Sequence, residues 1–127
     1  MEKKELTKAE EQVMQILWKI NKGFLKDIVD RFPIPKPAST TVSTVIRVLV
    51  GKGFIGYNTY GKIHEYYPLI SKNDYFRNHV KSIITNYFQG SAPDFVSFFA
   101  NEQLKLSELE EIKRMIEEKI EIIKTKK

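Results

Sequence analysis

Cysteine is absent from this sequence of 127 residues, and its absence excludes disulfide bridges, thiolate zinc sites and thiol catalysis. Histidine is scarce, because His64 and His79 are the only two and they lack the spacing of an H-E-x-x-H metal motif. The sequence also has no G-x-S-x-G elbow and no glycine-rich phosphate loop. We therefore predict no catalytic residues and no metal site, expect no cofactor, and interpret the chain as a protein that is not an enzyme.

Long apolar runs are missing as well. No stretch approaches the length of a membrane span, and the first residues lack the apolar segment of an export signal. With 42% hydrophobic and 29% charged residues, the composition is typical of an ordered globular chain. We expect a cytoplasmic protein without membrane insertion, built as one compact domain or as a small domain with an arm.

Acidic residues are missing from one window of the chain. The whole sequence carries a net charge of +5 at pH 7, but no carboxylate lies between Asp30 and Glu65. Such a window favours a polyanionic partner, whereas chance clustering in a basic protein is the alternative interpretation. The basic residues of the window are Arg31, Lys36, Arg47, Lys52 and Lys62.

Residues 38–54, inside this window, have the strongest periodic pattern. Their apolar side chains recur at spacings of three and four, which predicts a helix with one buried face. Gly51 and Gly53 end the pattern, and Lys52 between them lies near the negative end of the helix. The opposite face carries short hydroxyls and one arginine, which can approach base edges and phosphates. An ordinary amphipathic helix with a threonine-rich surface is the alternative.

Two shorter helices are predicted before this one. Thr7 and Glu10 have the spacing of a capping box, which predicts a helix that begins here and continues to Ile20. A second helix is predicted over residues 25–32, and the three prolines of residues 33–37 then enforce a non-helical connection. Three short helices with a proline-containing turn before the third have the order of a helix-turn-helix.

The pattern changes to that of strands after Gly53. Strand-forming residues on either side of Gly61-Lys62 predict a hairpin, and we interpret His64, in phase with Tyr66, as a packed strand residue. A hairpin directly after a third helix is a wing, whose tip would meet a phosphate or the minor groove. The predicted DNA-binding residues are Lys36, Ser39, Thr40, Thr41, Ser43, Thr44, Arg47 and Lys62.

Residues 71–127 are predicted to be a helical arm. A helix over 71–88, an aromatic helix opened by Ala92-Pro93 and a last helix started by a capping box at 107–110 carry apolar faces without a core of their own. A twofold dimer would bury these faces, whereas folding back onto the same chain is the alternative. The predicted dimerisation residues are Phe95, Phe98, Phe99, Leu109, Ile112, Ile116 and Ile120.

These predictions combine into one fold class. We expect a mainly α protein with a small β-hairpin, in which a winged helix-turn-helix DNA-binding domain over residues 1–70 precedes a helical dimerisation domain over residues 71–127. A dimer suits double-stranded DNA, because twofold protein symmetry matches half-sites about one helical turn apart.

Four segments, in order, carry a further signal. They are LTKAEEQVMQILWK at 6–19, STTVSTVIRVLVGKGFI at 39–55, GKIHEYYPLI at 61–70 and NEQLKLSELEEIKRMIEE at 101–118. Together they resemble the first helix, the recognition helix, the second wing strand and the dimerisation tail of the penicillinase-repressor and methicillin-resistance-repressor family of winged-helix regulators. This resemblance covers almost the whole chain.

The resemblance implies a homodimeric repressor that binds a palindromic operator through helix 38–53 and the basic wing. It also implies release by a membrane-linked sensor protease, since Ser97-Phe98 falls where relatives are commonly cut between Asn and Phe. Ser43 and Val48 stand where relatives often carry basic residues, which bears on base preference and affinity. The lack of cysteine disfavours the copper sensing of some relatives.

Two other functions stay open at this point. A ligand-responsive regulator would line an effector pocket with the aromatic side chains of the arm, although such side chains at helical spacing usually pack. A winged helix that binds protein would show no salt-sensitive affinity for DNA despite the acid-free window. The operator sequence, the regulated genes and the inducing signal do not follow from the sequence.

Overall fold

The computed structural model describes residues 6–126, so the first five residues and Lys127 of the expected domains lie outside the described part. Backbone packing divides the chain into two compact units, Met1–His79 and Val80–Lys127. The division falls inside helix α4 (Lys72–Tyr87), whose first half belongs to the first unit. The domain boundary that we expected between residues 70 and 71 stays a prediction.

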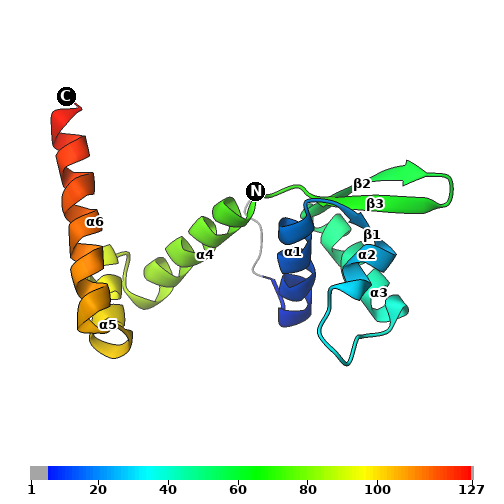
Figure 1. Cartoon of the computed structure of the whole chain (residues 1–127), viewed down its shortest axis with the longest axis horizontal. Helices are drawn as coiled ribbons and strands as arrows, with labels where there is room; N and C mark the ends of the chain where they lie inside the picture. The colour runs from blue at the N-terminus through cyan, green and yellow to red at the C-terminus, as the bar shows by residue number, and fades with distance from the viewer. Residues whose placement is uncertain (1–5, 127) are drawn as a thin grey trace. The chain divides into compact units, whose positions relative to one another are not determined.

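The first unit is a winged helix, which confirms the predicted fold class. Three helices precede the hairpin, and Figure 1 shows the hairpin projecting from them. The elements are α1 (Lys8–Ile20), β1 (Gly23–Phe24), α2 (Leu25–Asp30), α3 (Ser39–Gly51), β2 (Ile55–Tyr60) and β3 (Ile63–Pro68).

The sheet has one strand more than the predicted hairpin. Its order is β1-β3-β2, all antiparallel, and β2 and β3 pair from Ile55 with Pro68 to Tyr60 with Ile63. The additional strand, β1, has only two residues, which is too short for any alternation to be visible in the sequence. It becomes a strand because its backbone pairs with Tyr66 and Glu65 of β3.

The core of this unit lies between the three helices and the base of the sheet. The predicted capping box is confirmed, since the Glu10 N–H donates to Thr7 Oγ1 at 3.2 Å and the Thr7 N–H donates to Glu10 Oε1 at 2.9 Å. The buried face of α1 includes Glu10 and Met14, whereas Ala9 is exposed. The largest fully buried side chains are Val13, Met14, Leu17, Ile28, Val42, Ile46, Leu49, Phe54 and Ile55.

The second unit contains the end of α4, then α5 (Ala92–Gln103) and α6 (Leu106–Thr125). Ser91 caps α5 as an acceptor of the Asp94 N–H at 3.2 Å. The predicted start of α6 at residue 107 is wrong, because the helix begins at Leu106 and the Glu108 carboxylate accepts the Lys105 N–H at 2.9 Å. In the described residues no helix combines the length and the apolar character needed to cross a membrane.

Candidate nucleic-acid interface

The polar face of α3 is the first element of the candidate interface. Val42, Ile46 and Leu49 of this helix are buried in the core, which leaves the hydroxyl side chains on the outside. Thr40, Thr44 and Arg47 are four and three residues apart, so they form one exposed stripe along the helix. Of the predicted residues on α3, those exposed are Ser39, Thr40, Thr41, Thr44 and Arg47, while Ser43 is half-buried.

One hydroxyl of this stripe is already engaged within the helix. Thr44 Oγ1 donates to the Thr40 carbonyl oxygen at 3.0 Å, which restrains the side chain and uses its one hydroxyl proton within the helix. The first turn of α3 contains no acidic residue, so the partial positive charge of its amino end is not opposed there. A phosphate near this end would therefore meet a favourable potential.

Lys36 lies in the connection before α3 and forms an ion pair. Its Nζ is 3.7 Å from Asp30 Oδ1, and both side chains are about half exposed to solvent. An exposed pair of this kind contributes little to stability, and Lys36 can exchange Asp30 for a phosphate at low energetic cost.

The charge of Lys52 is paired within the fold, although 31% of its side chain is exposed to solvent. Its Nζ donates to both carboxylate oxygens of the buried Glu10, each at 2.9 Å. The pair joins the beginning of α1 to the end of α3. The acid-free window of the sequence therefore suggests more unpaired positive charge than the fold presents, because Glu10, from outside the window, neutralises Lys52.

Lys62 stands at the tip of the wing. It is exposed in the turn between β2 and β3, where Gly61 takes a positive φ of 63° that a side chain would disfavour. This placement follows from the hairpin register, in which Tyr60 pairs with Ile63.

A cluster of aromatic rings, which the sequence did not indicate, lies on the wing. The ring of His64 is 4.2 Å from that of Tyr57, and both rings are 6.0 Å from that of Tyr66. Burial and then the nearby Tyr57 raise the pKa of Tyr66, and the positive charge of Arg47 opposes this rise. Tyr66 therefore stays a neutral hydrogen-bond donor, and Arg47 of α3 lies within electrostatic reach of the wing.

The predicted dimerisation residues lie in the second unit. Phe98, Phe99, Leu109, Ile116 and Ile120 are exposed in one chain, whereas Phe95 and Ile112 are half-buried. The ring of Phe88 packs against that of Phe95 at 5.6 Å and that of Phe98 at 6.0 Å. Ser97 and Phe98, the expected cleavage position, lie on the exposed surface of α5.

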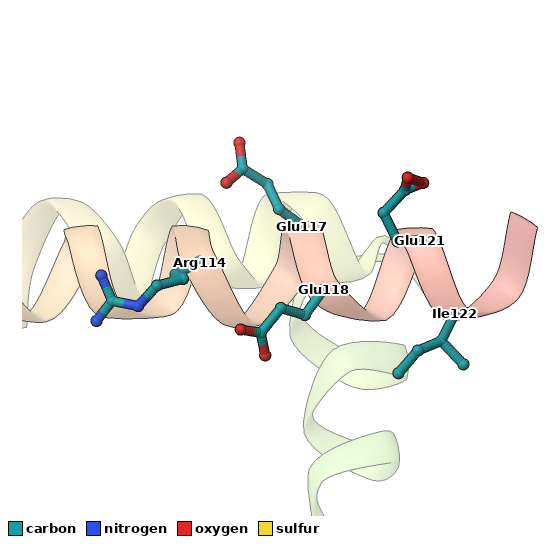
Figure 2. Close-up of a pocket in the computed structure, with 5 residues that line it drawn as sticks. All are labelled: Arg114, Glu117, Glu118, Glu121 and Ile122. Atoms are coloured by element: carbon teal, nitrogen blue, oxygen red, sulfur yellow. The ribbon is translucent and has the colours of Figure 1, made fainter.

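An open depression on α6 is lined by four charged side chains and one isoleucine. Figure 2 shows Arg114, Glu117, Glu118, Glu121 and Ile122 along one helix, with Glu117 and Glu121 extending to one side and Glu118 and Ile122 to the other. None of these residues is aromatic, so the depression does not match the effector pocket that a ligand-responsive regulator would need. Among residues 6–126, no group of three or more His, Cys, Asp or Glu side chains could hold a metal ion.

Comparison with known proteins agrees with these features. The penicillinase repressor family matches residues 6–118 of the chain. The methicillin resistance regulatory protein MecI of Staphylococcus aureus (strain N315) is 30% identical over 117 residues, which cover 91% of this chain and 95% of MecI. The penicillinase repressor of Bacillus licheniformis is 25% identical over 116 residues, which cover 90% of this chain and 91% of that protein.

A solved structure supports the fold. The solution structure of the DNA-binding domain of the repressor BlaI has a TM-score of 0.51 and 23% sequence identity, and it covers 58% of this chain and 92% of that domain. This likeness concerns the winged-helix architecture alone. The family match extends over most of the chain, through both compact units. The chain therefore belongs to the penicillinase repressor family, as the four sequence segments predicted.

Proposed function

We propose that this protein is a dimeric transcriptional repressor that binds a palindromic operator in double-stranded DNA. The observation that carries the proposal is the exposed stripe of Thr40, Thr44 and Arg47 on a helix whose opposite face is buried in the core. Short hydroxyls allow the helix backbone to approach base edges, and arginine is the side chain that most often reads guanine. The names of the relatives, a penicillinase repressor and the DNA-binding domain of a repressor, support this assignment.

The remaining basic groups would fix the position of α3 on the duplex. Lys36 before the helix and Lys62 at the wing tip are both exposed, and they flank the stripe in the chain. Contacts of this kind go to backbone phosphates and set the register without reading sequence.

The second unit would hold two copies of the chain together. Its exposed apolar side chains lie along α5 and α6, and burying them between two copies removes apolar surface from water. A dimer places two α3 helices on successive half-sites, so the contacts of both protomers contribute to one binding event. Cleavage between Ser97 and Phe98, by a membrane-linked sensor protease, would separate α6 from the DNA-binding unit and release the operator.

The deciding experiment titrates the protein into labelled DNA from upstream of its own gene and measures binding by fluorescence anisotropy at several salt concentrations. A scrambled duplex serves as the reference. We expect preferential, steeply salt-dependent binding with two protomers per site. Equal and weak binding to both duplexes would contradict the operator, and absence of binding at low salt would favour the protein-binding winged helix.

The variant Arg47→Ala tests the placement of α3 in this complex. We expect it to weaken operator binding by about tenfold or more and to reduce the salt slope by about 0.9 per protomer, because one phosphate or base contact is lost from each half-site. Arg114→Ala is the matched control, since it removes the same charge from α6. Unchanged affinity and salt slope in Arg47→Ala would show that another surface meets the DNA.

A further inference from the structure

One face of the wing continues the polar stripe of α3. Because side chains alternate along a strand, Tyr57 and Thr59 of β2 lie on the same face as Ile55, and their partners Tyr66 and His64 lie there too. Ile55 is buried against the helices, so this face of the sheet is the one that turns toward them. Farther along the hairpin the face opens to solvent, since Tyr57 and Thr59 are exposed and His64 is half-buried.

His64 is held in a defined orientation on this face. Its Nδ1 is 3.1 Å from Thr59 Oγ1, and its ring lies against that of Tyr57 with centroids 4.2 Å apart. The two nitrogens of an imidazole are on opposite sides of the ring, so the Thr59 contact directs Nε2 away from Thr59. A protonated imidazole donates from both nitrogens, which leaves Nε2–H as a charged donor while Thr59 occupies Nδ1.

We infer that His64 is a further DNA contact, which donates from Nε2 to a backbone phosphate beside the groove that α3 enters and binds more strongly when its ring is protonated. The inference rests on the proposed function. Arg47 of α3 acts electrostatically on Tyr66, and the ring of Tyr66 is 6.0 Å from that of His64, so the positive charge of α3 reaches the part of the wing that carries His64. A phosphate attracted to Arg47 would therefore lie on the side of the wing that carries His64.

The charged and titratable groups around His64 favour an anionic partner. Tyr57 of β2 and Tyr66 of β3 place phenol rings beside it, and Arg47 adds positive charge from α3. Lys62 at the tip of the hairpin adds a second cation. Glu65 pairs with Asn58, and strand alternation places both on the opposite face of the sheet. A phosphate would offset the repulsion between a protonated His64 and these cations.

The experiment measures the affinity of the full chain for the operator duplex between pH 5.5 and 8 at fixed ionic strength. Histidine is the side chain that ordinarily changes charge in this range. We expect the wild-type protein to bind more tightly at pH 5.5 than at pH 8, by roughly five- to tenfold per half-site at 0.1 M salt, with a salt slope steeper by up to about 0.9 per protomer.

Three variants separate His64 from other causes. His64→Gln keeps a hydrogen-bonding group without the charge, and we expect it to lose most of the pH dependence. His64→Lys supplies a permanent charge, so it should bind tightly at both pH values. His79→Gln is the matched control, because it removes the other histidine and should keep the wild-type pH profile.

The outcomes are distinct. Full wild-type pH dependence in His64→Gln, or loss of it in His79→Gln, would overturn the inference while leaving the repressor proposal intact. If neither the wild-type protein nor His64→Lys binds the operator at any pH, the proposed function itself fails. Should His64→Gln lose its fold, the pH profile of His64→Lys decides: a flat profile supports the contact, and an unchanged one rejects it.

Discussion

Glu10 is a carboxylate with only 6% of its surface exposed, and the fold surrounds it with donors. Burial raises the pKa of Glu10, but the hydrogen bond from the Thr7 N–H and the hydrogen bonds and charge of Lys52 lower it by more, so its pKa lies below the usual 4.5. A carboxyl group of this kind stabilises the fold above the unfolded-state pKa. The contribution is lost as the pH falls through the folded-state pKa.

The variant Glu10→Gln should therefore destabilise the winged unit in a pH-dependent way. We expect a loss of about 1–2 kcal/mol in the free energy of unfolding at pH 7, a modest figure because the Lys52 side chain is 31% exposed and its charge is partly screened by water. The difference from the wild-type protein should narrow as the pH falls below 4.5 and then through the lower pKa of the folded-state carboxylate. Urea unfolding followed by the fluorescence of Trp18, the one tryptophan, measures both quantities.

Glu11→Gln provides the control for this prediction. Glu11 is the exposed neighbour of Glu10 in α1, so the same change of charge should alter the unfolding free energy by less than about 0.5 kcal/mol. If both variants lower the free energy of unfolding equally, the effect comes from the overall charge, and the pair between Glu10 and Lys52 contributes nothing to stability.

Helix α4 has a function within the winged unit as well as beyond it. Its Tyr75 is 8% exposed, and its ring lies 5.8 Å from that of Trp18 and 5.9 Å from that of Phe54. The Leu6 N–H donates to the Tyr75 hydroxyl at 3.1 Å, and Trp18 Nε1 donates to the Ile70 carbonyl oxygen at 2.8 Å. The first turns of α4 thus complete the core that supports α3.

Truncating the Tyr75 side chain should destabilise the winged unit strongly. We expect Tyr75→Ala to cost about 3–5 kcal/mol, because it removes a buried aromatic side chain and leaves a cavity beside Trp18 and Phe54. Phe76→Ala is the matched control, since its ring is 61% exposed and its loss should change the unfolding transition little. Equal effects of the two variants on the Trp18 transition would contradict the packing of α4 into this core.

The sequence predicted elements that depend on local patterns and missed those that depend on long-range contacts. The period of the apolar residues located α3, and Gly61-Lys62 located the hairpin turn, because both signals lie within a few neighbouring positions. The short strand β1 forms only through its pairing with β3, far along the chain.

The face that α4 buries also depends on long-range contacts. The core uses Tyr75, whose hydroxyl accepts a hydrogen bond from the Leu6 N–H, whereas the neighbouring Phe76 is exposed. The ion pair between Lys52 and Glu10 joins residues that are 42 positions apart, so no local sequence pattern indicates it. Local chemistry therefore indicated the polar stripe of α3, while the aromatic cluster of the wing required the strand register.

The whole molecule combines a DNA-binding unit with a second unit that leaves several apolar side chains of α6 exposed in one chain. Leu109, Ile116 and Ile120 of α6 repeat at intervals of seven and four, which aligns them along one side of the helix. Glutamate and lysine side chains occupy the positions beside them, as in a two-stranded seam. If this seam is the dimer interface, a charge placed within it must separate the protomers.

We expect Ile116→Glu, at a position 49% exposed in one chain, to convert the dimer to a monomer in sedimentation velocity at micromolar concentration, because two buried carboxylates would face each other across the seam. The monomer should keep the Trp18 unfolding transition of the winged unit, since α6 contributes no residue to that core.

The operator affinity of the Ile116→Glu monomer should fall by about 100-fold and its salt slope by about half. A single half-site supplies only half of the phosphate contacts, and the second half-site is no longer tethered. Ile122→Glu, on a different side of α6, is the control and should stay dimeric. A monomeric Ile122→Glu beside a dimeric Ile116→Glu would place the interface on the other side of α6. Unchanged operator affinity of a monomeric Ile116→Glu would show that one winged unit alone accounts for operator binding.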